Sequence, residues 1–135
     1  MRFISVYDDL KTAIPLLYRL LAERQPHVNI SHRTMPTFDE HRIFVNSRPY
    51  AYWYIFGPEG APIGAIYLTH AHEIGVFVLR RHRRQGHGAE AVRWLIDQHP
   101  GWRFLANVNP ANKWSAEMFI NLGFRPIQTT YELRP

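Results

Sequence analysis

The residues with the clearest chemical potential are two glycines and their neighbours near the middle of the chain. Residues 83–88 read R-x-x-G-x-G and lie between a strand-like run, 73–79, and a helix-like run, 89–96. A loop that leads from a strand into a helix presents free backbone N–H groups at the positive end of the helix dipole. Gly86 and Gly88 lack a Cβ, so the backbone can approach a ligand closely. The segment therefore predicts a pyrophosphate cradle, although short glycine patterns also recur by chance.

A second motif follows at residues 107–124, where a strand end and a turn precede a short helix, 115–122. Asn112 is placed to cap this helix, and Gly123 is a typical stop signal. The two segments, in this order and at this separation, resemble the GNAT superfamily of acyl-CoA N-acyltransferases. The first matches its phosphate-binding loop, and N-x-x-S followed by Gly-Phe matches its second cofactor motif. The amino-sugar-nucleotide N-acetyltransferases of bacteria show a looser similarity.

The resemblance implies that acetyl-CoA is the co-substrate and lies in a cleft where the fourth and fifth strands splay apart. Fourth-strand backbone would pair with the pantetheine, the loop would hold the pyrophosphate, and two residues of the second motif would contact the pantetheine or phosphate end. The residues so implied are Val76, Phe77, Val78, Arg83, Arg84, Gln85, Gly86, His87, Gly88, Ala89, Asn112 and Ser115. A purely helix-capping role for Asn112 stays open.

Acetyl transfer to an amine needs a base, donors for the developing oxyanion and an acid for the departing thiolate. The resemblance places the base near the start of the fourth strand, at His72 or Glu73. Histidine suits the task because its ordinary pKa of about 6.5 lies near working pH. Strand alternation predicts that these two side chains point to opposite faces. Both could also be plain surface residues at a strand end.

Two positions depart from the family pattern. Asn107 stands where some relatives have a glutamate base, and an asparagine cannot take the proton. Phe119 stands where many relatives have a tyrosine acid, so Ser115, Tyr131 or water would have to supply that proton. A core role for Phe119 and a coenzyme A-binding module with reduced or no catalysis are therefore alternatives, as is a protein N-acetyltransferase.

Composition restricts the remaining choices. The chain has 135 residues, 46% hydrophobic and 20% charged, which is typical of one globular domain, 1–135. It has no cysteine, which excludes disulfides, thiolate metal sites and a cysteine nucleophile, and we expect no metal. Its net charge of +5 fits the phosphates of coenzyme A, with Arg80 and Arg81 beside the loop, or a solvated basic face. A nucleic-acid partner is not favoured, because no aromatic-basic nucleotide motif is present.

The first residues lack an apolar run of signal length, and the longest apolar runs are too short to span a membrane, so we expect a cytoplasmic protein. The oligomeric state is left open, a homodimer included. The expected acceptor is a primary amine of a small molecule or amino sugar. Acceptor recognition is assigned by the resemblance to the segment between the first two helices and to an aromatic run. That set is Asn29, Ser31, His32, Arg33, Met35, Tyr50, Tyr52, Trp53 and Tyr54.

The elements that must position these residues follow from periodicity and turn signals. Strands are expected at 3–7, 50–56, 63–68, 73–79, 102–108 and 127–133, and a loop at 26–35. A first helix should begin near Thr12, with Pro15 in its first turn, and a capping box of Thr37 and Glu40 should open a second helix. The order predicts an α/β fold: a mixed, mostly antiparallel sheet with helices on both faces, splayed between strands 4 and 5.

Overall fold

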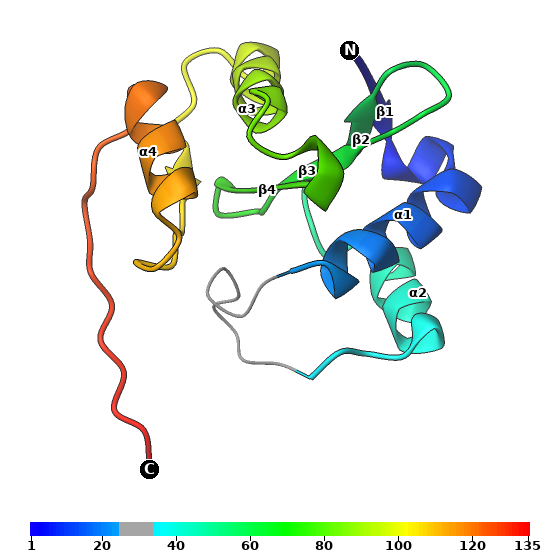
Figure 1. The fold of residues 1–135 in the computed structure, drawn as a ribbon, viewed down its shortest axis with the longest axis horizontal. Helices are drawn as coiled ribbons and strands as arrows, with labels where there is room; N and C mark the ends of the chain where they lie inside the picture. The colour runs from blue at the N-terminus through cyan, green and yellow to red at the C-terminus, as the bar shows by residue number, and fades with distance from the viewer. Residues whose placement is uncertain (25–33) are drawn as a thin grey trace.

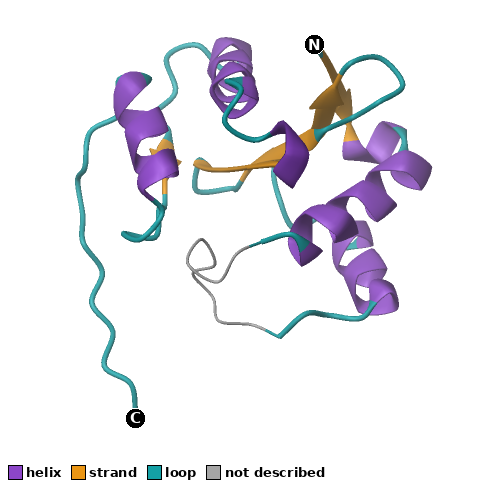
Figure 2. Cartoon of the chain, viewed as in Figure 1, coloured by secondary structure: helices purple, strands orange, loops and turns teal. Residues whose placement is uncertain are grey.

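The computed structural model describes residues 1–24 and 34–135, and Figure 2 shows its helices, strands and loops. They are β1 (Arg2–Ser5), η1 (Val6–Asp8), α1 (Leu10–Ala22), α2 (Phe38–Asn46), β2 (Tyr52–Gly57), β3 (Gly64–Leu68), β4 (Glu73–Val78), η3 (Arg80–His82), α3 (His87–Gln98), β5 (Leu105–Ala106) and α4 (Lys113–Asn121). Most of the expected loop at 26–35 lies outside the described residues.

The strands form one sheet in the order β1-β2-β3-β4-β5. Neighbours are antiparallel except β4 and β5, which are parallel and pair only through Glu73 with Leu105 and Ile74 with Ala106. Beyond Ile74 the two strands separate, so the rest of β4 is an open edge inside the sheet. The predicted mixed, mostly antiparallel sheet with a splay between strands 4 and 5 is confirmed.

Helices cover both faces of this sheet, α1 and α2 on one and α3 and α4 on the other (Figure 1). Alternate residues of β2 enter the two cores: Trp53 and Ile55 pack with α1 and α2, and Phe56 packs with α3 and α4. Because side chains alternate between the two faces of a strand, β2 contributes to the hydrophobic core on each side of the sheet. No described helix has the length and apolarity needed to cross a membrane.

Local capping signals account for where most helices begin. Thr37 Oγ1 accepts from the Glu40 N–H while the Glu40 carboxylate accepts from the Thr37 N–H, so the predicted capping box is confirmed. The predicted start of α1 at Thr12 is wrong: Asp9 accepts from the Thr12 N–H, and the helix begins at Leu10. Pro15 consequently lies inside the helix rather than in its first turn.

Two expected strands differ from the structure. The fifth strand is confined to Leu105–Ala106, and before it the side chain of Trp102 stacks on the His72 and His99 rings. The expected closing strand, 127–133, is wrong: the tail carries no regular structure, and Leu133 is 97% exposed. Alternation in sequence is a local signal, whereas a strand also needs a partner edge, and the two-residue β5 offers very little of one.

Candidate active site

The open edge of β4 is defined by the direction of its backbone groups. The His72 carbonyl accepts from the Leu105 N–H at 2.9 Å, and the Glu73 carbonyl accepts from the Thr69 N–H at 2.9 Å. Alternation along the strand therefore turns the backbone of Val76 and Val78 toward the splay and that of Phe77 toward β3. Of the three residues expected to pair with pantetheine, Val76 and Val78 turn backbone groups toward the splay, and the Val78 carbonyl already accepts from Arg83 Nε.

Arg83 ties the end of β4 to the end of α1. Its Nε donates to the Val78 carbonyl at 3.0 Å, and its terminal nitrogen donates to the Glu23 carbonyl at 3.2 Å. Its backbone N–H donates to the Arg80 carbonyl at 3.2 Å. The structure therefore makes Arg83 a brace for the loop, with its expected phosphate-binding N–H already committed.

The loop that follows presents the cradle. Within the described part of the chain, no hydrogen-bond partner is present for the backbone N–H groups from Arg84 through Gln85, Gly86, His87 and Gly88 to Ala89. Gly86 is the N-cap of α3 with φ 85°, and a Cβ there would meet no atom within 4 Å. These N–H groups lie at the positive end of α3, which is the arrangement that binds phosphates.

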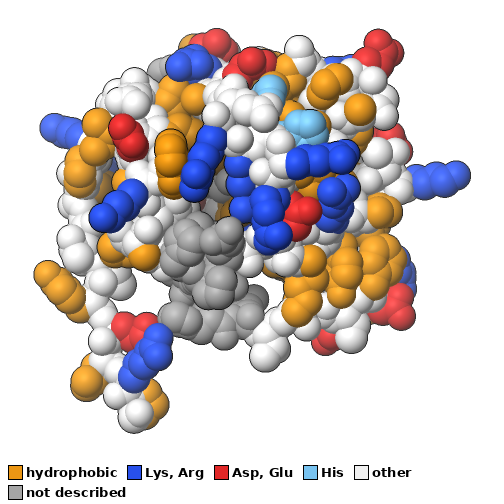
Figure 3. All heavy atoms as spheres, viewed as in Figure 1, with side chains coloured by type: hydrophobic (Ala, Val, Ile, Leu, Met, Phe, Trp, Pro, Cys, Tyr) orange, Lys and Arg blue, Asp and Glu red, His pale blue; other side chains and the backbone are white. Residues whose placement is uncertain are grey.

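The second motif packs beside this loop. Asn112 Oδ1 accepts from the Ser115 N–H at 3.3 Å, so its predicted capping role is confirmed, and its Nδ2 donates to Ser115 Oγ at 3.0 Å. The Arg84 guanidinium lies 4.2 Å from the centre of the exposed Trp114 ring. Lys and Arg side chains gather over the middle of the face shown in Figure 3, the area where Figure 1 shows the segment between β4 and α3.

Glu73 is the acid–base group that the structure places at the splay. Its Oε2 accepts from Asn107 Nδ2 at 2.5 Å, and its Oε1 accepts from the Thr69 hydroxyl at 3.4 Å. Its backbone N–H also donates to Thr69 Oγ1 at 2.9 Å. The carboxylate is half-buried and held from both sides, with Asn107 reaching it across the gap between β4 and β5.

His72 points to the other side of the sheet. It lies in the turn before β4 with φ 63°, and its ring stacks on Trp102 with centroids 4.5 Å apart. Trp102 in turn stacks on His99 at the end of α3, with centroids 4.3 Å apart. Burial lowers the pKa of His99, and the nearby His72 lowers it further. The two expected bases therefore lie on opposite faces, but His72 is held there by the turn and by Trp102 and lies outside the strand.

The residues considered for the acid step have different surroundings. Phe119 is buried, and its ring packs edge-on against Phe124 at 5.1 Å, so it is a core residue. Ser115 is close to the phosphate loop through α4, but its hydroxyl is bonded to Asn112. Tyr131 is 90% exposed in the C-terminal tail, so the structure does not bring it to the site.

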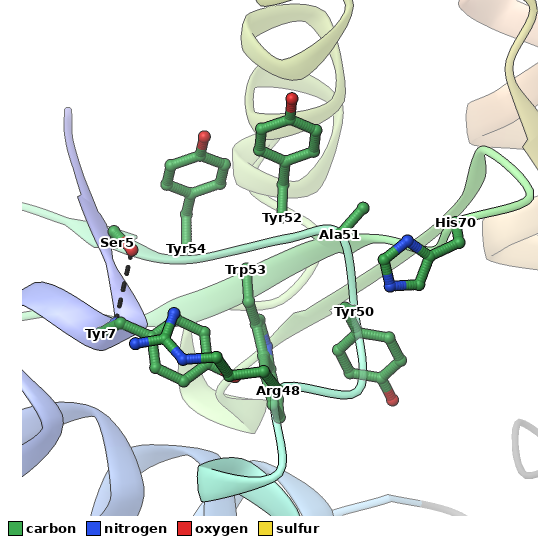
Figure 4. Close-up of a pocket in the computed structure, with 9 residues that line it drawn as sticks. All are labelled: Ser5, Tyr7, Arg48, Tyr50, Ala51, Tyr52, Trp53, Tyr54 and His70. Atoms are coloured by element: carbon green, nitrogen blue, oxygen red, sulfur yellow. Dashed lines mark hydrogen bonds between the residues drawn. The ribbon is translucent and has the colours of Figure 1, made fainter.

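A cavity of about 300 Å³ lies at the start of β2, away from the splay (Figure 4). It is lined by Ser5, Tyr7, Arg48, Tyr50, Ala51, Tyr52, Trp53, Tyr54 and His70. Figure 4 shows Tyr52 and Tyr54 on one side of the strand and Trp53 and Arg48 on the other. The expected aromatic acceptor set is therefore divided between two faces, Met35 is exposed, and Asn29, Ser31, His32 and Arg33 lie outside the described residues.

Sequence reasoning missed three contacts around the splay: Asn107 to Glu73, Thr69 to Glu73, and the brace made by Arg83. Asn107 was identified as a position without a base, but nothing in the sequence pairs it with a residue 34 positions away.

Among the described residues, no group of three or more His, Asp or Glu side chains could hold a metal ion.

Comparison with known proteins identifies the class. The Acetyltransferase (GNAT) family model matches residues 14–124, so the chain belongs to this family. No curated protein sequence matches the chain.

Solved structures share the fold at low identity. A putative acetyltransferase from Salmonella typhimurium, solved with its cofactor acetyl-CoA, superposes with a TM-score of 0.68 at 16% identity over 92% of this chain and 79% of that one. A ribosomal-protein-alanine N-acetyltransferase from Brucella melitensis gives 0.69 at 17% identity, covering 93% and 85%. A spermidine N-acetyltransferase chimera from Vibrio cholerae and hSSAT gives a TM-score of 0.72 at 12% identity, covering 95% of this chain and 84% of that one.

Proposed function

We propose that this acetyltransferase-family protein moves an acetyl group from acetyl-CoA to a primary amine of a small molecule or amino sugar. The observation that carries the proposal is the run of N–H groups from Arg84 to Ala89, without a hydrogen-bond partner among the described residues, beside the open edge of β4. A pyrophosphate fits the first feature and an extended pantetheine chain fits the second. The similar structure from Salmonella typhimurium was solved with acetyl-CoA, and the other two similar structures carry the names of N-acetyltransferases, which supports an amine acceptor.

Glu73 is the base in this proposal. It lies where the strands separate, and Asn107 and Thr69 fix its carboxylate without neutralising it. His72 is less suited, because its ring is packed against Trp102 on the opposite face.

The reaction begins when Glu73 takes a proton from the substrate ammonium. The freed amine attacks the thioester carbonyl, the C–N bond forms, and the C–S bond then breaks. The second amine proton passes through water to the departing thiolate, because the buried Phe119 has none to give. A backbone N–H on the open edge of β4, that of Val76, is the group on this chain best placed to donate to the developing oxyanion.

Calorimetry with acetyl-CoA tests the donor site. Gly86→Trp should abolish or strongly weaken binding, because the indole would fill the cradle. Gly101→Trp is the matched control: Gly101 also has a left-handed backbone, φ 82°, and open space around a new Cβ, but it lies in the turn after α3. Equal acetyl-CoA affinity in wild type and Gly86→Trp would refute the proposed cradle.

Release of free thiol in an acceptor screen tests the reaction itself. Turnover with small amines or amino sugars is the expected result. Turnover only with peptide or protein amines would favour a protein N-acetyltransferase. Tight coenzyme A binding without turnover on any amine would favour a binding module instead.

A further inference from the structure

Arg24, directly after α1 and its C-cap, carries a guanidinium group with no counterion in the described part of the chain. The group lies 3.9 Å from the centre of the Phe77 ring, and its Nε is excluded from solvent with no hydrogen-bond partner among the described residues. Burial lowers the pKa of Arg24, while Tyr67 and Tyr50 act in the opposite direction. Arginine nevertheless keeps its charge in proteins, so a positive charge is held here among aromatic rings.

The carboxylates of Glu23, the C-cap of α1, and of Glu73, on β4, have other partners. Glu23 Oε1 accepts from the Arg80 N–H at 2.7 Å, and its Oε2 pairs with Arg19 at 3.3 Å. Glu73 is held by Asn107 and Thr69. A buried charge without a partner is unfavourable, and an arriving anion would remove that cost.

Arg24 lies on the same face of β4 as the proposed base. Phe77, which it covers, and Glu73 are four residues apart on one strand, so their side chains share the face packed by α1 and α2. Gly75 lies between them, and a Cβ there would come within 2.0 Å of the Tyr67 ring. Tyr67 therefore lies over the middle of β4, and Tyr50 stacks on it at 3.9 Å.

We infer that Arg24 binds an anionic group, a carboxylate or a phosphate, on the amine acceptor. This inference rests on the proposed function. The planar guanidinium can bind either anion through two N–H groups, and the Phe77 ring covers one of its faces. Four strand residues separate the two ends by roughly 13 Å along the backbone. The spacing favours an acceptor whose anion lies several bonds from its amine, such as an ω-amino acid or an amino-sugar phosphate.

Paired probes that differ only in charge test this subsite. Binding of ε-aminocaproate and its neutral amide, and of glucosamine phosphate and glucosamine, is measured by calorimetry on the protein saturated with coenzyme A. Coenzyme A fills the phosphate loop and carries no acetyl group, so no turnover occurs. In at least one pair the anionic member should bind about 10- to 100-fold more tightly than its neutral counterpart. A preference in the aminocaproate pair indicates a carboxylate, and a preference in the glucosamine pair indicates a phosphate.

Variants assign the preference to Arg24. Arg24→Gln should reduce it to about twofold or less, Arg24→Lys should retain part of it, and Arg93→Gln, at an exposed position on α3, should retain all of it. Coenzyme A affinity shows that each variant is folded. Equal binding within both pairs by wild type, or an undiminished preference in Arg24→Gln, would overturn the inference while leaving the proposed function intact. If Arg24→Gln does not fold, the charge preference of wild type and its partial loss in Arg24→Lys test the inference instead. Failure of wild type to bind coenzyme A would instead overturn the proposed function.

Discussion

Replacing Glu73 by glutamine isolates proton transfer from the geometry that supports it. The glutamine side chain has the same shape, and its carbonyl oxygen can still accept from Asn107 Nδ2, so the contact across β4 and β5 is preserved. The ability to take a proton is lost, and the amide NH2 that replaces the second oxygen cannot accept from the Thr69 hydroxyl. Removing a positioned base typically slows a reaction by about 10²–10⁴-fold, and we expect a loss of kcat/KM in that range.

Acetyl-CoA affinity should stay at the wild-type value, because the cradle at Arg84–Ala89 is at the other end of β4. Asn107→Ala should have a smaller effect, about tenfold or less, since the base remains and only one of its hydrogen bonds is removed. Initial rates of thiol release across a pH series, with calorimetry on the same samples, provide both measurements.

His72→Ala is the competing variant. It removes the ring that stacks on Trp102 and should change kcat/KM by less than tenfold. A large loss in His72→Ala with none in Glu73→Gln would refute the assignment made from the structure. If neither variant slows an established transfer tenfold, the protein acts by holding an already neutral amine against the thioester, which requires no side-chain base.

Two further predictions concern stability. Gly75→Ala would place a Cβ 2.0 Å from the Tyr67 ring, so urea unfolding should show a loss of about 1–3 kcal/mol that shrinks in a Tyr67→Ala background; equal losses in both backgrounds would contradict the packing argument. Burial lowers the pKa of His41, with a further contribution from Arg24, so the folded chain keeps this ring neutral where the unfolded chain takes a proton near pH ~6.5. Stability should therefore be level above about pH 7.5 and fall as the pH drops through 6.5, whereas His41→Phe should weaken that fall in the urea midpoint.

Short-range signals in the sequence determined a large part of this protein. The capping box at Thr37 and Glu40, the cap at Asn112 and the loop at Gly86 each depend on contacts within one helical turn, and each is found where the pattern predicts it. The alternation along β4, which places Glu73 and Ile74 on opposite faces of the sheet, is equally local. Such features can be read from residue order because bonding partners are three or four positions apart.

Tertiary structure alone decided how the site is assembled. Asn107 reaches Glu73, Arg83 braces α1, and Arg24 covers Phe77 only because sheet register and helix packing bring distant segments together. The C-terminal tail also shows that a local pattern is not sufficient: residues 127–133 alternate as a strand would, but they pair with no described strand. Propensity and periodicity describe what a segment can form, and long-range pairing decides which groups meet, because that choice depends on the free energy of the whole packed chain.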